Sequence, residues 1–358
     1  MKGYDLVEIG EKGAWDEIVR MCPYSTPFNS WLWRCALSER FVGMKPSYFV
    51  MRSENEDLAA MPLFLFSTLP ALRSALSMPW NLFGGPMIRR DLLDDVDLIR
   101  SSIAAMEQIA RQNGAYELII TRPPLSPESL RSELQRWADQ SERRFTHLLR
   151  LDPDFERIWR SYNPRVRTAV RKANRLGVRW IRTKSEDKLK EFYDIYLKAM
   201  LRFGSPPKPY ELLRYVQTSP IGDLIVAEVE GKVIAGLLFL IFDKTITLWC
   251  GASLHEFRSY RPNNLIFNEV IKWGCQNGYE WVDFGASPPE NRGLVAFKEE
   301  WRAVRFDFEI YHKVFSPARK RVWEKIEPDL RRFYSFLQSA KMKLKRNALI
   351  SLECSVSP

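Results

Sequence analysis

The stretch from Asp223 to Trp301 constrains the fold of this chain more than any other. It holds three β-rich runs, then a helical pattern, then a short apolar run. The β-rich runs are Leu224–Val229, Val233–Phe242 and Thr245–Cys250. Glu230-Gly231 and Asp243-Lys244 separate them, and such short polar turns predict a tight antiparallel meander.

A helix is predicted directly after the meander. Pro262 is typical of the first turn of a helix, and Gly278 is typical of the position just past its end. The apolar residues between them recur with helical spacing and form one wide stripe: Leu265, Ile266, Val270, Ile271 and Trp273. The next strand, Trp281–Phe284, is short and largely apolar, as expected of an interior strand beside the meander.

Composition indicates a globular protein with enough residues for two domains. The chain has 358 residues, 46% of them hydrophobic, and 12 Trp, which excludes a disordered chain. Its longest apolar run, Val233–Phe242, is too short to span a bilayer, and its first residues lack the apolar block of a signal peptide. We therefore expect a cytoplasmic protein.

Cysteine and histidine usage argues against metal and disulfide chemistry. The five Cys are widely spaced without a CxxC pair, and the three His are scattered. We expect no metal site, no disulfide framework and no tightly bound cofactor. The net charge of +10 instead favours a polyanionic partner, which is a nucleic acid, an anionic lipid surface or a phosphorylated small molecule.

The same order of elements recurs near the N-terminus. Its segments are hairpin strands Tyr48–Met51 and Leu58–Phe66, a Gly84-Gly85 corner, a helix over Asp91–Gln112 and a strand over Tyr116–Thr121. The string QNG follows both long helical patterns, at 112–114 and at 276–278. We predict two copies of one α/β fold, with domains at 1–145 and 146–316 and a basic C-terminal helix and tail at 317–358.

A strongly basic helix is predicted over Arg165–Leu176. Arg167, Arg171 and Arg175 lie four residues apart on it, so they form one cationic ridge. Such a ridge suits the phosphate backbone of a nucleic acid, and every phosphate contact makes binding more sensitive to salt. The alternative is a solvated helix face.

A second basic segment, Pro317–Arg346, interleaves cations with aromatic and aliphatic residues. This pattern predicts an amphipathic helix with two open roles. It either docks on an anionic membrane, which would place the protein at the inner membrane face, or packs on the second domain.

Eight strings of the sequence together carry a family resemblance. They are PFNSWLWRCAL (27–37), GGP (84–86), NPRVRTAVRKANRLGV (163–178), IYLKAMLRFGSPP (195–207), GKVIAGLLF (231–239), YRPNNLIFNEVIKWGCQNG (260–278), VDFGAS (282–287) and GLVAFKEEW (293–301). They resemble the FemABX family of peptidyltransferases and the related FemAB-like and BioF2-like acetyltransferase-domain proteins. The resemblance covers about residues 25–312 and is most specific between Arg165 and Trp301. One departure is Trp301-Arg302-Ala303, where the family has Trp-Gly-Ala, and it leaves the backbone turn there open.

The resemblance implies both a fold and an activity. The fold is α/β (α+β), with tandem GNAT-like domains that are each a mixed, mostly antiparallel sheet flanked by helices. Well-studied members transfer an amino acid from aminoacyl-tRNA to an amine of a cell-wall precursor that carries a nucleotide or lipid diphosphate. We therefore expect amide formation on a phosphorylated or lipid-linked glycan or peptide precursor. The alternatives are an acyl-coenzyme A-dependent N-acyltransferase and a non-catalytic module that binds such a precursor.

The resemblance also suggests roles for four residues. Lys298 matches a lysine whose ammonium stabilises the oxyanion formed when an amine attacks an ester, and the backbone carbonyl of Phe297 helps to handle the amine proton. Arg202 matches an arginine that contacts substrate phosphate, which suits its planar fork. Trp33 is a further substrate-binding candidate. The plainer alternatives are a solvated lysine for Lys298 and a cation at a helix C-terminus for Arg202.

Six further candidates follow from their positions. Asp283 lies at a strand end, where a carboxylate orients the acceptor amine, acts as a general base or serves a structural role. The other candidates cluster where the loop enters the helix begun by Pro262, and they are Arg258, Tyr260, Arg261, Asn263 and Asn264. In GNAT enzymes this corner receives the diphosphate of coenzyme A. The glycine-rich signature usual at that corner is missing here, which disfavours coenzyme A as the donor.

Overall fold

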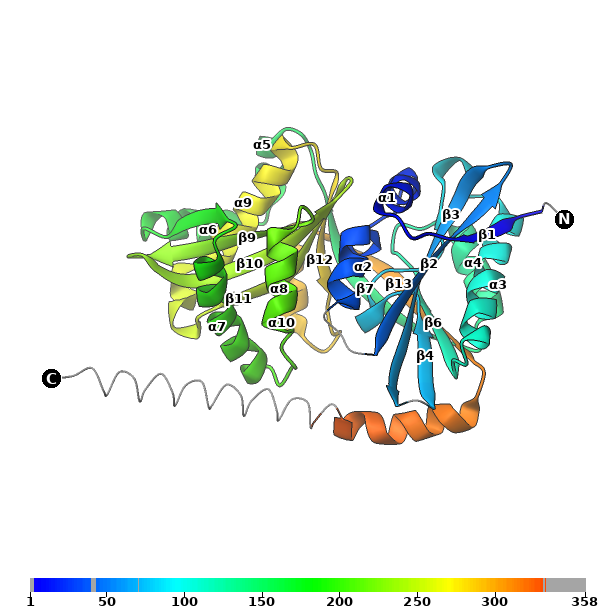
Figure 1. The fold of residues 1–358 in the computed structure, drawn as a ribbon. Coiled ribbons are helices and arrows are strands. Elements are labelled where there is room, and N and C mark those ends of the chain that lie inside the picture. Colours follow the sequence, from blue (N-terminus) through cyan, green and yellow to red (C-terminus); the bar gives the residue numbers. More distant parts are fainter. Residues whose placement is uncertain (1–2, 40–42, 70, 331, 333–358) are drawn as a thin grey trace.

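The computed structural model describes residues 3–39, 43–69, 71–330 and 332, and their strands join into one sheet (Figure 1). The N-terminal half contributes β1 (Asp5–Glu8), β2 (Met44–Ser53), β3 (Glu56–Leu69), β4 (Leu72–Leu76), β5 (Met87–Ile88), β6 (Glu117–Thr121) and β7 (Gln140–Arg150). The C-terminal half contributes β8 (Arg179–Thr183), β9 (Gly222–Val229), β10 (Lys232–Phe242), β11 (Thr245–Ser253), β12 (Trp281–Ala286) and β13 (Val304–Val314). The strand order is β1-β2-β3-β4-β6-β13-β7-β12-β11-β10-β9-β8, and β5 pairs with β3.

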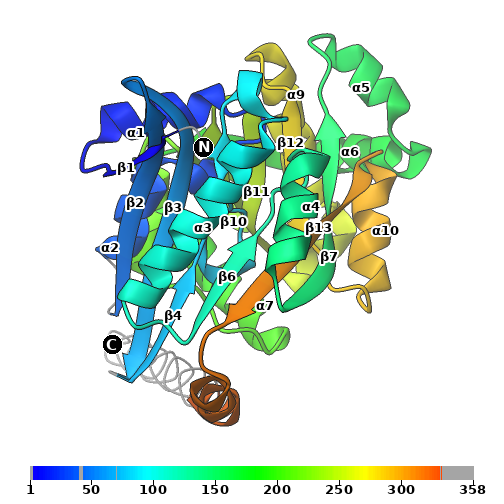
Figure 2. The ribbon, with the colours of Figure 1, turned by 90° about the vertical axis from the view of Figure 1, so that its right-hand side faces the viewer.

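Helices cover both faces of this sheet. Those of the N-terminal half are α1 (Lys12–Met21), α2 (Trp31–Ser38), α3 (Val96–Gln112) and α4 (Glu128–Trp137). Those of the C-terminal half are α5 (Phe155–Ser161), α6 (Pro164–Arg175), α7 (Glu186–Arg202), α8 (Tyr210–Thr218), α9 (Pro262–Gln276) and α10 (Arg292–Glu300). In the N-terminal half, α3 and α4 lie on one face and α1 and α2 on the other (Figure 2). A contact between α2 and α8 joins the halves, which share one hydrophobic core.

The predicted meander and its repeat are confirmed. Strands β9, β10 and β11 pair antiparallel, and α9 then crosses over to β12, which runs parallel to β11. In the N-terminal half, α3 precedes β6, which runs parallel to β4. The two QNG strings also act alike, because the side chains of Asn113 and Asn277 donate to helix carbonyls four residues back, at 2.9 and 2.8 Å. The glycine after each has a positive φ, 70° at Gly114 and 75° at Gly278.

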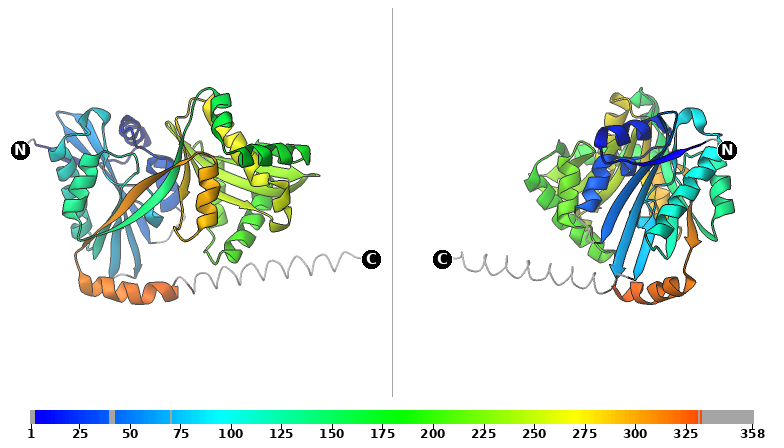
Figure 3. Two further views of the ribbon diagram at one scale, coloured as in Figure 1. Left: turned by 180° about the vertical axis from the view of Figure 1, so that it is seen from behind. Right: turned by 45° about the vertical axis from the view of Figure 1, so that its right-hand side comes forward.

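Two long strands are shared between the halves. Strand β13 comes from the C-terminal half but lies between β6 and β7, and β7 lies between β13 and β12. Seen from behind, β13 and β7 run side by side between the two lobes (Figure 3). Each half is thus completed by a strand of the other. The boundary predicted after residue 145 falls inside β7, and the division into domains stays a prediction.

One predicted helix begins later than expected. The pattern over Asp91–Gln112 predicted a single helix, but α3 starts at Val96, and residues 90–92 form a separate 3-10 turn. The Asp95 carboxylate accepts a hydrogen bond from the Leu98 N–H (2.9 Å) and so caps α3. An aspartate is more stable as an N-cap than inside a helix, which explains the later start.

The C-terminal helix packs on the N-terminal half. Residues 317–330 are helical, and the ring of Trp323 meets Phe66 edge-on with centroids 6.4 Å apart. Lys320 pairs with Glu117 (3.1 Å), and Arg319 donates to the Gly114 carbonyl (2.8 Å). The described part of this helix therefore does not pack on the second domain, one of its two expected roles. The rest of the predicted tail, 331 and 333–358, lies outside the described residues.

Candidate active site

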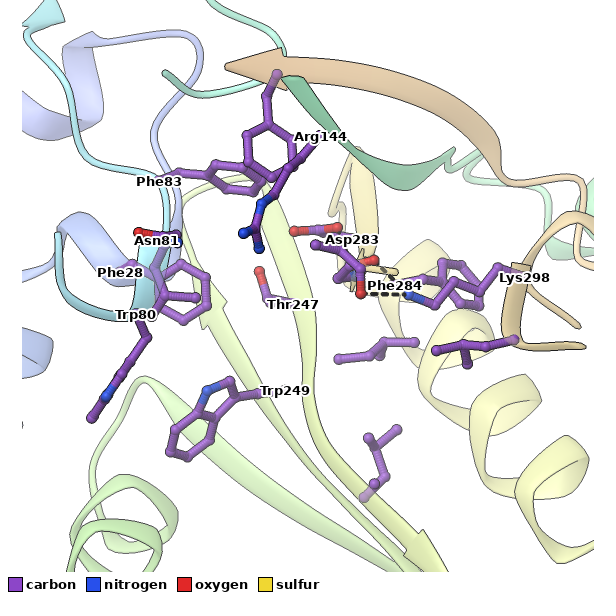
Figure 4. Close-up of a pocket in the computed structure, with 18 of the residues that line it drawn as sticks. Phe28, Trp80, Asn81, Phe83, Arg144, Thr247, Trp249, Asp283, Phe284 and Lys298 are labelled. Atoms are coloured by element: carbon purple, nitrogen blue, oxygen red, sulfur yellow. Dashed lines mark hydrogen bonds between the residues drawn. The ribbon is translucent and has the colours of Figure 1, made fainter. Parts of the chain in front are cut away.

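A cavity of about 440 Å³ lies between the two halves (Figure 4). The N-terminal half supplies Phe28, Trp80 and Phe83 to its wall, and the C-terminal half supplies aromatic side chains that include Trp249 and Phe284. Asp283 on β12 and Lys298 on α10 also line it. Neither half alone encloses this space.

Helix α10 holds Lys298 in place from both ends. At its start, the Asn291 side chain accepts a hydrogen bond from the Leu294 N–H (3.1 Å) and caps the helix. At its end, the fully buried Trp301 ring packs against Phe267 and Phe297, with centroids 6.0 and 6.1 Å away. These contacts fix the direction in which Lys298 points.

The Lys298 ammonium is buried and only partly satisfied by protein groups. Its side chain is 4% exposed, and Nζ donates to the carbonyls of Gly285 (2.5 Å) and Ala286 (3.3 Å). These carbonyls are available to Lys298 because the pairing of β12 with β7 becomes irregular between Asp283 and Ala286. Gly285 has a φ of 76° at this point. An ammonium group has three protons, so one is left for the cavity.

A buried carboxylate accompanies this ammonium. The Asp283 Oδ1 accepts hydrogen bonds from the Thr146 hydroxyl (2.5 Å) and the Gly285 N–H (2.8 Å). Burial raises the pKa of Asp283, while these two hydrogen bonds and the charge of Lys298 oppose the rise. Burial lowers the pKa of Lys298 to about 8, and the Asp283 carboxylate offsets part of that fall.

The lowered pKa of Lys298 should be visible by direct titration. Because burial disfavours the ammonium, this lysine should lose its charge as pH rises through about 8, whereas an exposed lysine does so near about 10.4. NMR of protein with ¹³C-labelled lysine measures the midpoint, and the signal is assigned by its loss in Lys298→Met. A midpoint above 10 would contradict the burial of this group.

The departure at Arg302 keeps a glycine-like turn. Arg302 has φ 63°, the left-handed conformation that glycine adopts most readily, and its Nε donates to the Ser161 carbonyl (2.9 Å). The hydrogen bond helps to hold a conformation that costs a non-glycine residue roughly 1–2 kcal/mol. The turn after Trp301 is therefore formed with arginine in place of glycine.

Two predicted substrate-binding residues do not line the cavity. Trp33 is fully buried behind its wall, edge-on to Trp249 and Phe28, with centroids 5.2 and 5.1 Å away. Arg202 ends α7 in an exposed position, with its guanidinium 4.9 Å from the Phe203 ring centroid. Their binding roles stay predictions.

The group at the start of α9 divides between two settings. Arg261 and Asn264 line a second hollow, of about 470 Å³, opposite Arg165 and Lys172 of α6. The other three residues do not line it and make local contacts. The Arg258 guanidinium lies 3.4 Å from the His255 ring nitrogen, and the Asn263 amide donates to the Ser253 hydroxyl (3.2 Å). The Tyr260 ring packs against Phe257, with centroids 5.5 Å apart. Arg261 precedes the helix in the left-handed region, with φ 60°.

The predicted arginine ridge is only partly available to a ligand. Arg167 donates to the carbonyls of Arg160 (2.9 Å) and Tyr162 (2.5 Å), so it joins α6 to α5. Arg171 lies over the Trp159 ring, 5.7 Å from its centroid, and Arg175 is exposed. A nucleic-acid role for the three stays a prediction.

Known proteins share both this fold and part of this sequence. The family model described as "Acetyltransferase (GNAT) domain" matches residues 160–299. Lipid II:glycine glycyltransferase from two strains of Staphylococcus epidermidis is 27% identical over 144 residues, 36% of this chain and 31% of that protein. The crystal structure of FemX superposes with a TM-score of 0.72 at 14% identity, over 90% of this chain and all of that chain. The chain therefore contains a segment similar to GNAT acetyltransferase domains and shares its fold with FemX.

Other solved structures share this tandem fold. A tandem GNAT protein from the clavulanic acid biosynthesis pathway has a TM-score of 0.55 at 13% identity, over 88% of this chain and all of that one. The C-terminal domain of a putative lysylphosphatidylglycerol synthetase from Agrobacterium fabrum has a TM-score of 0.54 at 15% identity, over 86% of this chain and 93% of that domain. The match to the curated glycyltransferases spans about a third of their length.

The sequence did not point to several residues of the cavity. Arg144, Lys208 and Thr247 line it, and Thr146 holds Asp283. Strand alternation could have indicated Arg144 and Thr146, because both fall on one face of β7. Lys208 gave no local signal, because it lies in an irregular loop and reaches the cavity with Nζ 5.3 Å from the Trp249 ring centroid.

The described residues also bear on metal and membrane sites. Among them, His, Cys, Asp and Glu form no cluster that could hold a metal ion. No helix in the described ranges is long and apolar enough to cross a bilayer.

Proposed function

We propose that this protein is an aminoacyl or acyl transferase that forms an amide on an amine of a phosphate-bearing or lipid-linked precursor of the cell wall or cell surface. The observation that carries the proposal is the buried pair of Lys298 and Asp283 on a cavity shared by both halves. An ammonium with one free proton and a carboxylate with a raised pKa are the groups that amide formation needs.

Each group has a distinct role in the step. The acceptor amine attacks the carbonyl carbon of the donor ester, and the free proton of Lys298 stabilises the oxyanion that forms. Asp283 accepts the proton that the amine loses. The new C–N bond replaces the C–O bond of the ester, and the leaving hydroxyl regains a proton. The backbone carbonyl of Phe297 assists in this proton transfer. It is not used by the Trp301 N–H, which donates to the Lys298 carbonyl instead (3.2 Å).

Aromatic and cationic groups suit a phosphorylated acceptor. Trp80 and Trp249 offer flat apolar faces to a sugar or base, and Lys208 adds a cation next to Trp249. The similar S. epidermidis proteins are named for transfer to lipid II, which supports an acceptor linked to a lipid diphosphate. We therefore place the protein in the cytoplasm, at the inner membrane face when its acceptor is lipid-linked.

The second hollow is the proposed donor site. Arg165, Lys172 and Arg261 line it, and the N-terminus of α9 adds favourable electrostatics for phosphate. Phe297 lines both hollows, so a donor in one and an acceptor in the other would meet beside Lys298. Exposed cations continue along α6 to Arg171 and Arg175, which favours the longer polyanion, aminoacyl-tRNA, over acyl-coenzyme A.

A labelled-donor assay tests this function. Protein is mixed with a nucleotide-linked or lipid-linked amine precursor and with either ¹⁴C-aminoacyl-tRNA or ¹⁴C-acyl-coenzyme A. We expect transfer from aminoacyl-tRNA. Lys172→Ala should raise KM for the tRNA about tenfold, and added salt should raise it further, because both weaken binding of the phosphate backbone. Lys190→Ala, which removes an exposed lysine of α7 that pairs with Asp187 (3.3 Å), is the matched control.

Other outcomes of the same assay select the alternatives. Transfer from acyl-coenzyme A alone would replace the proposed donor. Binding of the precursor without transfer from either donor would leave only a non-catalytic binding module.

A further inference from the structure

Strand β7 presents alternate side chains to the cavity. Thr146 donates to Asp283, and Arg144, two residues earlier, lines the cavity on the same face of the strand. Arg143 belongs to the opposite face, where it pairs with Asp307 of β13. One face of β7 therefore leads from Arg144 directly to the Asp283 carboxylate.

The Arg144 guanidinium is held by a neighbour but keeps donors free. Glu142, also on the cavity face of β7, accepts from the Arg144 Nε (2.8 Å) and lies 2.8 Å from Nη2. The Nη1 edge of the fork is left for a ligand. In Figure 4 this guanidinium points into the cavity, toward Asp283 and Thr247.

Asp283 and Thr247 are the polar groups that share the cavity wall with Arg144. Thr247 pairs with Asp283 in the parallel register of β11 and β12, so their side chains are neighbours on one face of the sheet. Thr247 is 3% exposed, and its hydroxyl has no hydrogen-bond partner among the described residues. Arg144 and Asp283 form no ion pair within the described chain, so opposite charges face one another across open space.

From this arrangement we infer that the acceptor amine is borne by a carbon that also carries a carboxylate, an α-amino acid head group. The inference rests on the proposed function and specifies its acceptor. The ammonium of such a head group would face Asp283, its carboxylate would take the free edge of Arg144, and the Thr247 hydroxyl would donate to the same carboxylate. A simple alkylamine, such as a lysine side chain, leaves Arg144 and Thr247 unused.

A phosphate at Arg144 explains the same residues less well. The buried Asp283 carboxylate faces this position and would repel a dianionic phosphate. Lys208 lies beside Trp249 and suits a phosphate without that repulsion. A zwitterion offers an ammonium to Asp283 and a carboxylate to Arg144, whereas a phosphate offers negative charge to both.

Two acceptors that differ at one residue test the inference. They are uridine-diphosphate-linked muramyl pentapeptides with either meso-diaminopimelate, whose free amine adjoins a carboxylate, or lysine, whose free amine does not. Calorimetry without donor gives the Kd of each, and the transfer assay gives kcat/KM. We expect diaminopimelate to be favoured about 10- to 100-fold, the range of one charge-assisted hydrogen-bonded pair. Arg144→Ala should remove this preference by weakening only the diaminopimelate acceptor.

Arg143→Ala is the matched control, because it removes an exposed arginine from the opposite face of β7 and should leave the preference unchanged. Equal affinity for the two acceptors, or an equal loss of both in Arg144→Ala, would overturn the inference while transfer itself upheld the proposed function. Failure to bind either acceptor would overturn the inference together with the acceptor class proposed above.

Discussion

Replacing Lys298 with methionine should lower kcat by about 100- to 1,000-fold, with little change in the Kd of the acceptor. The expected size is that of removing one donor from an oxyanion site. Methionine keeps an unbranched chain of similar length in the 4% exposed position, so the packing of α10 should be retained. The measurement is single-turnover transfer with saturating donor, together with calorimetric binding of the acceptor.

The controls for this variant separate chemistry from folding. Lys190→Met changes an exposed lysine on α7 and should keep full activity. Near-UV circular dichroism should be the same for both variants and the wild type. A kcat within threefold of wild type for Lys298→Met would refute the oxyanion role and favour a binding module.

Replacing Asp283 with asparagine should lower kcat by about 100-fold or more. The asparagine side-chain oxygen can still accept from Thr146 and Gly285, so the shape of the site is kept and only the charge and basicity are lost. The charge of Asp283 also raises the pKa of Lys298. Its removal should therefore move the Lys298 midpoint to a pH below about 8. Kinetics and ¹³C-lysine NMR measure the two effects on one protein.

A neutral replacement elsewhere provides the comparison for Asp283→Asn. Asp243 lies in the turn between β10 and β11 with φ 47°, a conformation that asparagine also tolerates. Asp243→Asn should change neither kcat nor the Lys298 midpoint. If Asp283→Asn lowered kcat and left the Lys298 midpoint in place, the two groups would not be coupled as their burial indicates.

Local patterns were enough to predict the elements of the C-terminal half. The runs around Glu230-Gly231 and Asp243-Lys244 predicted β9, β10 and β11, because turn residues with positive φ mark hairpins. Pro262 and Gly278 bracketed α9, whose start and stop are set by groups within the helix itself. Such signals lie within a few residues of the feature that they determine.

Long-range pairing was not predictable in the same way. Strand β13 was not expected, and its insertion between β6 and β7 joins residues almost two hundred positions apart, as in Ile310 opposite Thr121. The residues of β13 do not indicate which strands it pairs with, because an interior strand needs only an apolar pattern and two free strand edges to pair with. The pairing of β7 with β12, again between segments far apart in the sequence, brings Arg144 to Asp283, so the acceptor side of the cavity was also hidden.

The two α/β repeats, the Phe297-Lys298 pair and the cationic character of α6 could be recognised from the residues alone. The burial of Lys298 beside Asp283, the place of Trp33 behind the cavity wall and the direction of Arg144 became known only from the folded chain. The physical reason is that turns, caps and amphipathic stripes are set by neighbours along the chain. Burial and charge coupling depend on which distant segments pack together, and here the strands shared by the two halves decide that.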